Sequence, residues 1–353
     1  MFAFDSSNSM EIITIEGKTG LSKIYIGERL ARVDTYLPAK GVFIITDRNV
    51  NDLYGMGFPD FPVFVAEPGE ASKDFSVMTT IYHWLLENGA DRSSFILGIG
   101  GGVVCDLAGF VASTFMRGIR FGFVASTLLA QVDASVGGKN GVNLGGYKNI
   151  VGTFTQPEFV ICDTQMLTTL SPDEFRNGMA EVIKHALIRD KEKFYFLQKE
   201  QEALLNRQTD AVNHIVSRSV KIKAAIVQAD EREQGQRRLL NFGHTWGHAI
   251  EKVEGIAHGK AVSLGMAFAS SLSVKKGCFT TSDHHQAIAL LQDYGLPVQM
   301  SLDKEKVFEV MLKDKKKEQN IMHFVLLDAI GSAFVHPWDV NDLKELVFND
   351  SPL

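Results

Sequence analysis

The chain has 353 residues, which exceeds one ordinary hydrophobic core and indicates two domains. Its composition, with 45% hydrophobic residues, 22% charged residues and 31 Gly, is typical of a globular α/β protein with many tight turns. The formal net charge of -6 argues against a general nucleic-acid-binding surface, because such surfaces concentrate Lys and Arg. Local basic pockets for a small anionic molecule are compatible with this charge.

Cysteine usage and the apolar segments indicate a cytoplasmic protein. Cys105, Cys162 and Cys278 are too few and too widely spaced for a disulfide framework. The segment Met1–Ile15 has neither a basic start nor a continuous apolar core, so we do not expect a signal peptide. Phe95–Met116 is apolar, but its five glycines and its central aspartate argue against a membrane span.

Short runs of β-branched and aromatic residues alternate with longer mixed segments in the first half of the chain. This pattern predicts parallel strands joined by helices. The predicted strands are Ile24–Ile26, Val42–Thr46, Val63–Ala66, Ser94–Gly98 and Phe121–Ala125. Between the third and fourth strands, Lys73–Asn88 has apolar residues at helical spacing, and Gly89 stands where a C-terminal cap belongs.

A glycine-rich turn follows the fourth predicted strand. Ile96–Asp106 reads Ile-Leu-Gly-Ile-Gly-Gly-Gly-Val-Val-Cys-Asp, a strand that leads into glycines and then into a helix. Such a turn lets the backbone approach a phosphate, and the helix offers unpaired N–H groups. The spacing is not a strict GxGxxG, so close packing of the helix on the strand is the alternative. Asp47, Asn49 and the turn Pro68–Lys73 follow two other strands and favour a dinucleotide.

The second half has long helical periodicity and few strand-like runs. It begins at Ser171, which reads as an N-cap before Pro172 at the first helical position. Further predicted helices are Thr209–Asp230, His244–Glu254, Ala261–Lys276, His284–Tyr294 and Lys304–Lys313, followed by a hairpin of Met322–Leu327 and Ser332–Val335. We therefore expect an α/β domain over residues 1–170 and a mainly α-helical domain over residues 171–353.

Several motifs, in the same order along the chain, resemble the 3-dehydroquinate synthase family of the sugar phosphate cyclases. One of them reads Asn-Phe-Gly-His-Thr-Trp-Gly-His. The matching stretches are Gly100–Gly118, Leu128–Lys139, Lys148–Asn149, Asn177–Lys184, Asp230–Glu233, Asn241–His248 and His258–Gly259. The resemblance implies a Rossmann-like NAD-binding domain, a helical domain that binds metal and substrate, and a substrate cleft between them.

The resemblance also implies a zinc site, in which Co²⁺ is an alternative to Zn²⁺. Glu181, His244 and His258 match the family's ligands, and one carboxylate with two imidazoles leaves open positions on a catalytic zinc. His248 lies one helical turn after His244, so either can bind metal, and the family pattern gives His248 a substrate contact instead. His185, four residues after Glu181, is a rival ligand that the family motif does not use.

The remaining implied site residues fall into three groups. The residues implied in NAD binding are Asp47, Asn49, Glu70, Lys73, Gly101, Gly102, Val103, Asp106, Ser126, Thr127, Asp133, Lys139, Lys148 and Asn177. Those implied in catalysis are Lys139, Lys184, His248, Glu233, Arg237 and Asn241, and those implied in substrate binding are Arg117, Asn149, Lys223 and Lys316. Arg and Lys suit the carboxylate and the phosphate of the implied substrate.

The implied activity is that of a carbon–oxygen lyase in the shikimate pathway of aromatic amino acid biosynthesis. It converts 3-deoxy-D-arabino-heptulosonate 7-phosphate to 3-dehydroquinate and phosphate. The steps are oxidation by NAD, phosphate elimination, reduction, ring opening and aldol closure, so NAD is not consumed. The family also implies a homodimer.

Departures from the family pattern leave alternatives open. Asn140 stands where Thr is frequent, and Lys260 stands where Glu usually follows His-Gly, so Lys260 either weakens metal binding or points to solvent. The rival functions are a cyclase acting on a neutral ketose phosphate or glucose 6-phosphate, a metal-dependent polyol dehydrogenase, and a non-catalytic binding protein. Lys139, Lys223 and Arg237 favour a substrate that carries a carboxylate.

Overall fold

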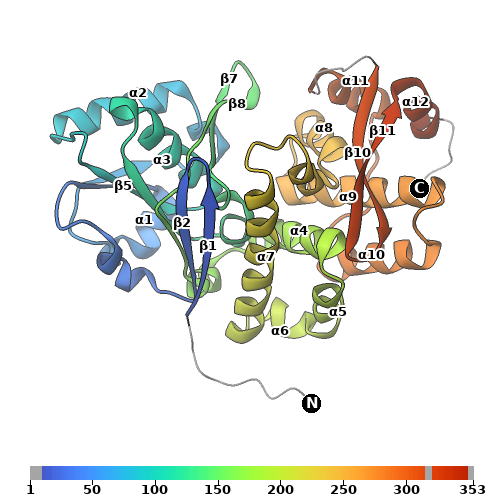
Figure 1. The fold of residues 1–353 in the computed structure, drawn as a ribbon, viewed down its shortest axis with the longest axis horizontal. Coiled ribbons are helices and arrows are strands. Elements are labelled where there is room, and N and C mark those ends of the chain that lie inside the picture. Colours follow the sequence, from blue (N-terminus) through green and yellow to red (C-terminus); the bar gives the residue numbers. More distant parts are fainter. Residues whose placement is uncertain (1–9, 315–319, 349–353) are drawn as a thin grey trace. The chain divides into compact units, whose positions relative to one another are not determined.

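The computed structural model describes residues 10–314 and 320–348. The chain forms two compact units (Figure 1), of which the first comprises Met1–Leu170 with Val212–Glu231 and the second comprises Ser171–Ala211 with Arg232–Leu353. The division after Leu170 coincides with the expected boundary. The expectation was wrong for Val212–Glu231, which belongs to the first unit and not to the second. Lys316 lies outside the described residues.

The first unit is built on a seven-stranded sheet in the order β1, β2, β9, β6, β5, β3, β4. Only β1 is antiparallel to its neighbour, and all other pairs are parallel. The bounds are β1 Glu11–Gly17, β2 Gly20–Ile26, β3 Val42–Asp47, β4 Val63–Ala66, β5 Phe95–Gly100, β6 Arg120–Ala125 and β9 Phe159–Cys162. Every residue of β5 is buried, because parallel strands are covered on both faces.

Three helices connect strands of this sheet, namely α1 (Arg48–Tyr54), α2 (Phe75–Glu87) and α3 (Gly102–Thr114). The expected helix from Lys73 begins two residues later, because the Asp74 carboxylate caps it by accepting a 2.9 Å hydrogen bond from the Ser76 N–H. Gly89 has a φ of 75° just after this helix, as predicted for a C-terminal cap.

A hairpin that the sequence analysis missed projects from the first unit, formed by β7 (Lys139–Leu144) and β8 (Tyr147–Phe154). Asn140 holds its base, since the side-chain amide donates 3.1 Å hydrogen bonds to the carbonyls of Gly138 and Thr155. The Asn140 Oδ1 atom lies against α3 at Gly109, where an added Cβ would meet it at 1.9 Å. The carboxamide therefore fills the space that Gly109 leaves on the helix surface.

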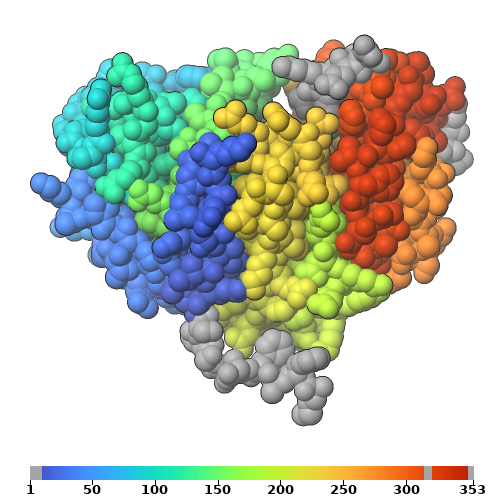
Figure 2. Space-filling model, in the orientation of Figure 1, coloured from blue at the N-terminus to red at the C-terminus, as the bar shows by residue number. Residues whose placement is uncertain are grey.

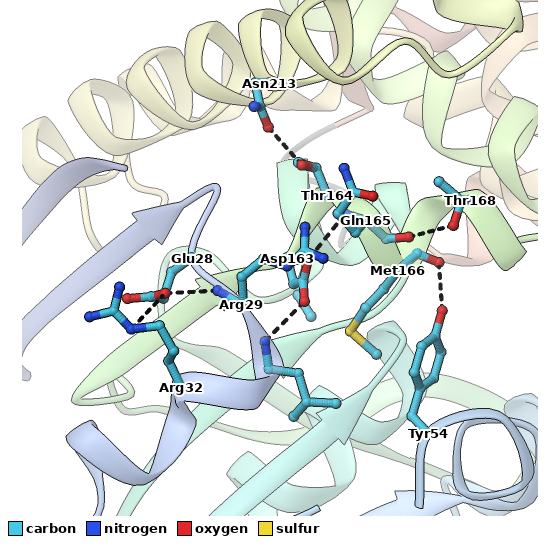
Figure 3. Close-up of polar contacts among 12 residues, drawn as sticks. Glu28, Arg29, Arg32, Tyr54, Asp163, Thr164, Gln165, Met166, Thr168 and Asn213 are labelled. Carbon is cyan, nitrogen blue, oxygen red and sulfur yellow. Dashed lines mark hydrogen bonds and ion pairs between the residues drawn. The ribbon is translucent and has the colours of Figure 1, made fainter. Parts of the chain in front are cut away.

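Side-chain carboxylates form hydrogen bonds and an ion pair near the carboxyl end of β9 (Figure 3). The Asp163 carboxylate accepts hydrogen bonds from the backbone N–H groups of Leu30, at 2.9 Å, and of Gln165, at 3.1 Å. Glu28 forms a 3.8 Å ion pair with Arg32 in the same region. These contacts hold the 3-10 helix η1 (Leu30–Tyr36) at this end of the sheet.

Helix α7 (Thr209–Ala229) belongs mostly to the first unit because its contacts there run along its length. Asn213 near its start accepts a 2.7 Å hydrogen bond from the Thr164 hydroxyl, as Figure 3 shows. Farther along, the Ser217 hydroxyl donates to Glu11 of β1 at 2.6 Å. The hairpin β1–β2 lies along this helix on the surface, blue beside yellow in Figure 2.

Glu231, just after α7, is buried to 8% exposure and fixes the turn between β1 and β2. Its carboxylate accepts hydrogen bonds from the Lys18 N–H at 2.8 Å, from the Thr19 N–H and hydroxyl, and from the Gln156 amide at 3.3 Å. Burial alone would raise the pKa of Glu231, but the hydrogen bonds from Thr19, Gln156 and Lys18 outweigh it and lower the pKa. Charged Glu231 therefore stabilises the first unit.

A Glu231→Ala variant is expected to lose about 3 kcal/mol of stability, because the buried Gln156 amide and the part-buried donors of Lys18 and Thr19 lose their acceptor. Since the folded-state pKa is lowered, this contribution is present at neutral pH and is lost as the pH falls through that lowered pKa. Denaturant unfolding at pH 7 and at acid pH measures both effects. Glu16→Ala, at an exposed carboxylate of β1, is the control, and equal stability of the two variants at pH 7 would refute the role of Glu231.

The second unit is mainly helical, as predicted. Its helices are α4 Pro172–Arg189, α5 Lys191–Lys199, α6 Gln201–Leu205, α8 His244–Glu254, α9 His258–Lys275, α10 Thr281–Asp293, α11 Lys304–Asp314 and α12 Val340–Phe348. Ser171 caps α4 as predicted, and a hairpin of β10 (Ile321–Ala329) and β11 (Ser332–Asp339) follows α11. The core packs Trp246 and Ile250 of α8 with Leu264 of α9 and Phe324 of β10. Within the described ranges, no helix is long and apolar enough to cross a membrane.

Candidate active site

Three potential metal ligands from three helices of the second unit converge on one point. Glu181 lies in α4, His244 is the first residue of α8 and His258 is the first residue of α9. The Nε2 atoms of both histidines lie 3.5 Å from the Glu181 Oε1 atom, and the three ligand atoms lie within 4.8 Å of one another. Ligand atoms about 2.1 Å from a tetrahedral zinc would stand roughly 3.4 Å apart, so the donor set fits this metal.

The far nitrogen of each imidazole also faces an oxygen. His244 Nδ1 lies 3.1 Å from the carbonyl of Phe242, and His258 Nδ1 lies 3.1 Å from Oε2 of Glu251. An Nδ1–H donated to such an oxygen leaves the Nε2 lone pair directed at Glu181, which is the tautomer that a metal requires. Sequence reasoning missed Glu251, although its spacing of seven residues from His244 places both on one face of α8.

The electrostatics of the cluster favour a bound cation. Burial, reinforced by Lys184 and the neighbouring imidazoles, lowers the pKa of His244 well below 6.5, so this ring is neutral at pH 7. Burial alone would also lower the pKa of His258, but Glu181 and Glu251 raise it to about 9. Two carboxylates thus converge on one imidazole, and a divalent cation would satisfy both the neutral ring and the charged groups.

The remaining histidines and cations of this region take different positions. His248 is exposed, and its ring centre lies 5.0 Å from that of His244. The rival ligand His185 is fully buried, and one of its nitrogens lies within 4.8 Å of a Glu181 oxygen. His185 does not belong to the cluster of Glu181, His244 and His258. Lys184 is 1% exposed and pairs with Glu181. Lys260 is exposed, which agrees with the interpretation that it points to solvent.

Other predicted residues of the second unit surround these helices. The Asn177 carboxamide accepts a hydrogen bond from the N–H of Gly259, next to His258. Asn241 donates a hydrogen bond to Glu233. Arg237 is only 2% exposed, and with Asn241 it lies in the 3-10 helix η7 (Gln236–Asn241). The structure therefore groups Glu233 with Asn241 and places Asn177 against the start of α9.

In the first unit, the predicted NAD residues follow four neighbouring strands. Since β6, β5, β3 and β4 are adjacent and parallel, their carboxyl ends share one edge of the sheet. The residues at these ends are Asp47 as the last residue of β3 and Asn49 after it, Glu70 and Lys73 after β4, Gly101, Gly102, Val103 and Asp106 after β5, and Ser126 and Thr127 after β6. Such an edge is where open α/β sheets bind ligands.

The turn at this edge fits a dinucleotide. Helix α3 begins after Gly101 without a side-chain cap, so its first N–H groups remain available to a phosphate. The buried Ser126 hydroxyl has no hydrogen-bond partner among the described residues, which is consistent with a partner supplied by a ligand. Close packing also accounts for part of the glycine run, because a Cβ at Gly98 would meet the Cβ of Ala108 at 2.9 Å.

A buried lysine links this edge to the β7–β8 hairpin. Lys73 is 3% exposed, and its Nζ atom lies 2.6 Å from Asp106 Oδ2 and 2.6 Å from Asn149 Oδ1. Glu70 is 3.5 Å from the same ammonium group. Asn149, expected to contact substrate, therefore shares a hydrogen-bond network with three residues expected to bind NAD.

The other predicted residues of the first unit divide between one buried pair and several exposed positions. Lys223 of α7 is 6% exposed, and its Nζ atom bonds Asp133 Oδ1 at 2.7 Å. Lys139 at the start of β7 and Lys148 in β8 are exposed. Arg117 is also exposed and has a φ of 73°. The structure therefore brings Lys223 and Asp133 together.

Solved structures with the same fold include two enzymes that make cyclic products. The 2-epi-5-epi-valiolone synthase of Streptomyces hygroscopicus, solved with NAD+ and Zn²⁺ bound, is 25% identical, with a TM-score of 0.84 over 92% of this chain and 96% of that chain. A 2-deoxy-scyllo-inosose synthase complexed with carbaglucose-6-phosphate, NAD+ and Co²⁺ is 26% identical, with a TM-score of 0.81 over 97% and 100%. The fold is that of the sugar phosphate cyclases, as expected from the sequence.

The sequence comparisons show to which family of the sugar phosphate cyclases the chain belongs. Models of the 3-dehydroquinate synthase N-terminal and C-terminal regions match residues 63–177 and 178–317. The 3-dehydroquinate synthase of Clostridium beijerinckii is 40% identical over 335 residues, which cover 91% of this chain and 94% of that protein. The chain belongs to the 3-dehydroquinate synthase family.

Proposed function

We propose that the chain converts 3-deoxy-D-arabino-heptulosonate 7-phosphate to 3-dehydroquinate and phosphate, with NAD and Zn²⁺ as cofactors and with Co²⁺ as an alternative metal. The cluster of Glu181, His244 and His258 in a member of this family carries the proposal. The sequence relatives also support it, because they are named 3-dehydroquinate synthases at about 40% identity, whereas the two cyclases with other products are 25% and 26% identical.

The two cofactors supply chemistry that side chains lack, since NAD accepts and returns a hydride while the metal lowers the pKa of a substrate hydroxyl. Glu181, His244 and His258 would hold the metal. The free N–H groups of α3 and the Ser126 hydroxyl would hold the cofactor's phosphates and orient its nicotinamide end. This division leaves the buried Lys184 and Arg237 for the substrate.

Buried cations would bind the anionic groups of the substrate. Lys184 and Arg237, at 1% and 2% exposure, lie in a low-dielectric environment where a carboxylate or a phosphate is attracted strongly. The other proposed substrate contacts are the buried Lys223, the exposed Lys139 and Arg117, and the neutral Asn149. Lys316 is proposed from its sequence position alone. Holding both ends of an opened sugar acid near each other would favour ring closure.

Proton handling is proposed for two residues. His248, exposed beside His244, would relay a proton at its imidazole nitrogen. Glu233 accepts a hydrogen bond from Asn241, which would orient the carboxylate. The residues proposed to contact or support the cofactor are Asp47, Asn49, Glu70, Lys73, Asp106, Asp133, Lys148, Thr127 and Asn177.

The direct test supplies the heptulosonate phosphate with NAD to the purified protein. We expect phosphate and 3-dehydroquinate in equal amounts, without net NADH. Chelation should stop turnover, and zinc or cobalt should restore it. Turnover of glucose 6-phosphate instead would identify a cyclase of neutral sugars, and NADH from glycerol without phosphate release would identify a polyol dehydrogenase. Full activity after verified metal removal would refute the metal assignment.

A homodimer in the cytoplasm is also part of the proposal. The dimer is an expectation from the family that the sequence motifs resemble. Sedimentation of the full chain at micromolar concentration would give the mass of the particle, and a single-chain mass would contradict the dimer.

A further inference from the structure

We propose that Glu251 is a positioning residue, which holds the His258 imidazole in the orientation and tautomer that present its Nε2 atom to the metal. This inference rests on the proposed function of the cluster formed by Glu181, His244 and His258.

The ring of His258 is held at both nitrogens within the second unit. Its Nδ1 atom lies 3.1 Å from the Glu251 Oε2 atom, and its Nε2 atom lies 3.5 Å from the Glu181 Oε1 atom. The Glu251 side chain is only 10% exposed, so water competes little for this carboxylate. When Nδ1 of the neutral ring donates its proton to the Glu251 carboxylate, the lone pair of the imidazole is left on Nε2.

The two ligand histidines differ in how they are held. The Nδ1 atom of His244 faces the backbone carbonyl of Phe242 at 3.1 Å, a partner that no substitution removes. The corresponding partner of His258 is a side chain, so its contribution can be measured by mutation. A carboxylate at this position also raises the basicity of the imidazole more than a carbonyl does, which strengthens the bond to a metal.

The position of His258 explains why its side chain needs this partner. It is the first residue of α9, and Ala257 before it provides no side-chain cap. The His258 side chain is 27% exposed, compared with 12% for His244, so packing restrains it less. Glu251 comes from the neighbouring helix α8, seven residues after His244, and therefore ties the two ligand-bearing helices together at the cluster.

An alternative role for Glu251 is that of a ligand, since His248, Glu251 and His258 also have ligand atoms within 4.8 Å of one another. In that arrangement the metal would lie on the Nδ1 side of His258, because the two ring nitrogens point in different directions. It would then leave the fully buried Glu181 and the His244 Nε2 atom that points at it without a role. The geometry therefore favours the positioning role.

The test compares Glu251→Gln with Glu254→Gln, which makes the same chemical change three residues later in α8. Zinc affinity of the full chain is measured by competition with a chromophoric chelator, and the visible spectrum of the Co²⁺ form reports the ligand set. We expect Glu251→Gln to bind one metal per chain about 10- to 100-fold more weakly, with faster metal release and an unchanged ligand set. Glu254→Gln should match the unaltered protein.

Two results would overturn the inference. Wild-type affinity in Glu251→Gln and also in Glu251→Ala would show that the carboxylate does not position the ring. A Co²⁺ spectrum that reports one lost ligand in Glu251→Gln would make Glu251 a ligand. If a His244→Ala variant instead binds metal as tightly as the unaltered chain, the proposed metal site itself fails. This outcome is distinguishable because it requires no Glu251 variant.

Discussion

A His244→Ala variant is expected to purify without stoichiometric zinc and to lose activity by a factor on the order of 1,000 or more, because the metal supplies several kcal/mol of transition-state stabilisation. The Nε2 atom of His244 lies 3.5 Å from Glu181, and no other atom of this ring can replace it at that point. Metal analysis and the rate of phosphate release measure the two effects separately. The histidine is preferable to Glu181 for this test, because removing Glu181 would leave buried Lys184 without its partner.

His285→Ala is the matched control for this variant. His285 lies in α10 of the same unit, is exposed and does not belong to any of the possible metal-binding groups of the described chain. It should retain full metal content and activity. A His244→Ala protein that still holds one zinc per chain would contradict the assignment and direct attention to His248 and Glu251.

A Lys139→Ala variant is expected to lower kcat/KM by about 100- to 1,000-fold, the range measured when one preorganised group that stabilises developing charge is removed. Lys139 begins β7 and is exposed, so the substitution should change the free energy of unfolding by less than about 0.5 kcal/mol. Initial rates over a range of heptulosonate phosphate concentrations, together with thermal unfolding, measure both quantities.

Lys40→Ala controls for the general loss of one positive charge, since Lys40 is exposed in the same unit and precedes β3. Its kinetics should equal those of the unaltered chain. Comparable turnover of Lys139→Ala and Lys40→Ala would remove Lys139 from the proposed catalytic groups.

The strands and helices that could be predicted from the sequence are those whose hydrophobic pattern is visible within a few consecutive residues. β4 was predicted with the same bounds, Val63–Ala66, because its apolar run is closed by turn residues on both sides. The β7–β8 hairpin was missed because most of β8 is exposed and its apolar residues do not alternate with polar ones as in a half-buried strand. The strand β9, which has four residues like β4, was also not predicted.

The place of α7 could not be predicted, because an amphipathic helix shows which face is buried and not what covers it. Its packing depends on partners far away in sequence, such as Glu11, which bonds Ser217 across 206 positions. The Glu231 contact with Lys18 spans 213 positions. No periodicity within the helix carries this information.

At the candidate site, spacing alone left His244 and His248 as equivalent ligands, since both lie on one face of α8. The structure separates them by burial and direction, because His244 points its Nε2 atom at Glu181 whereas His248 is exposed. Glu251 could not be found from the family motif, because its importance depends on where the first turn of α9 places His258. The ligand types came from the sequence, and their mutual orientation came from the packing of three helices.

The fit of Asn140 against Gly109 limits the order in which these two positions can change during evolution. A methyl group at position 109 would coincide with the Asn140 oxygen, so Gly109→Ala should be harmful in this protein. A smaller residue at position 140 would vacate that volume and make alanine acceptable afterwards. Gly109→Ala is thus deleterious while Asn140 is present and neutral once Asn140 has been replaced by a smaller residue. A relative with a side chain at position 109 should therefore have a smaller residue at position 140.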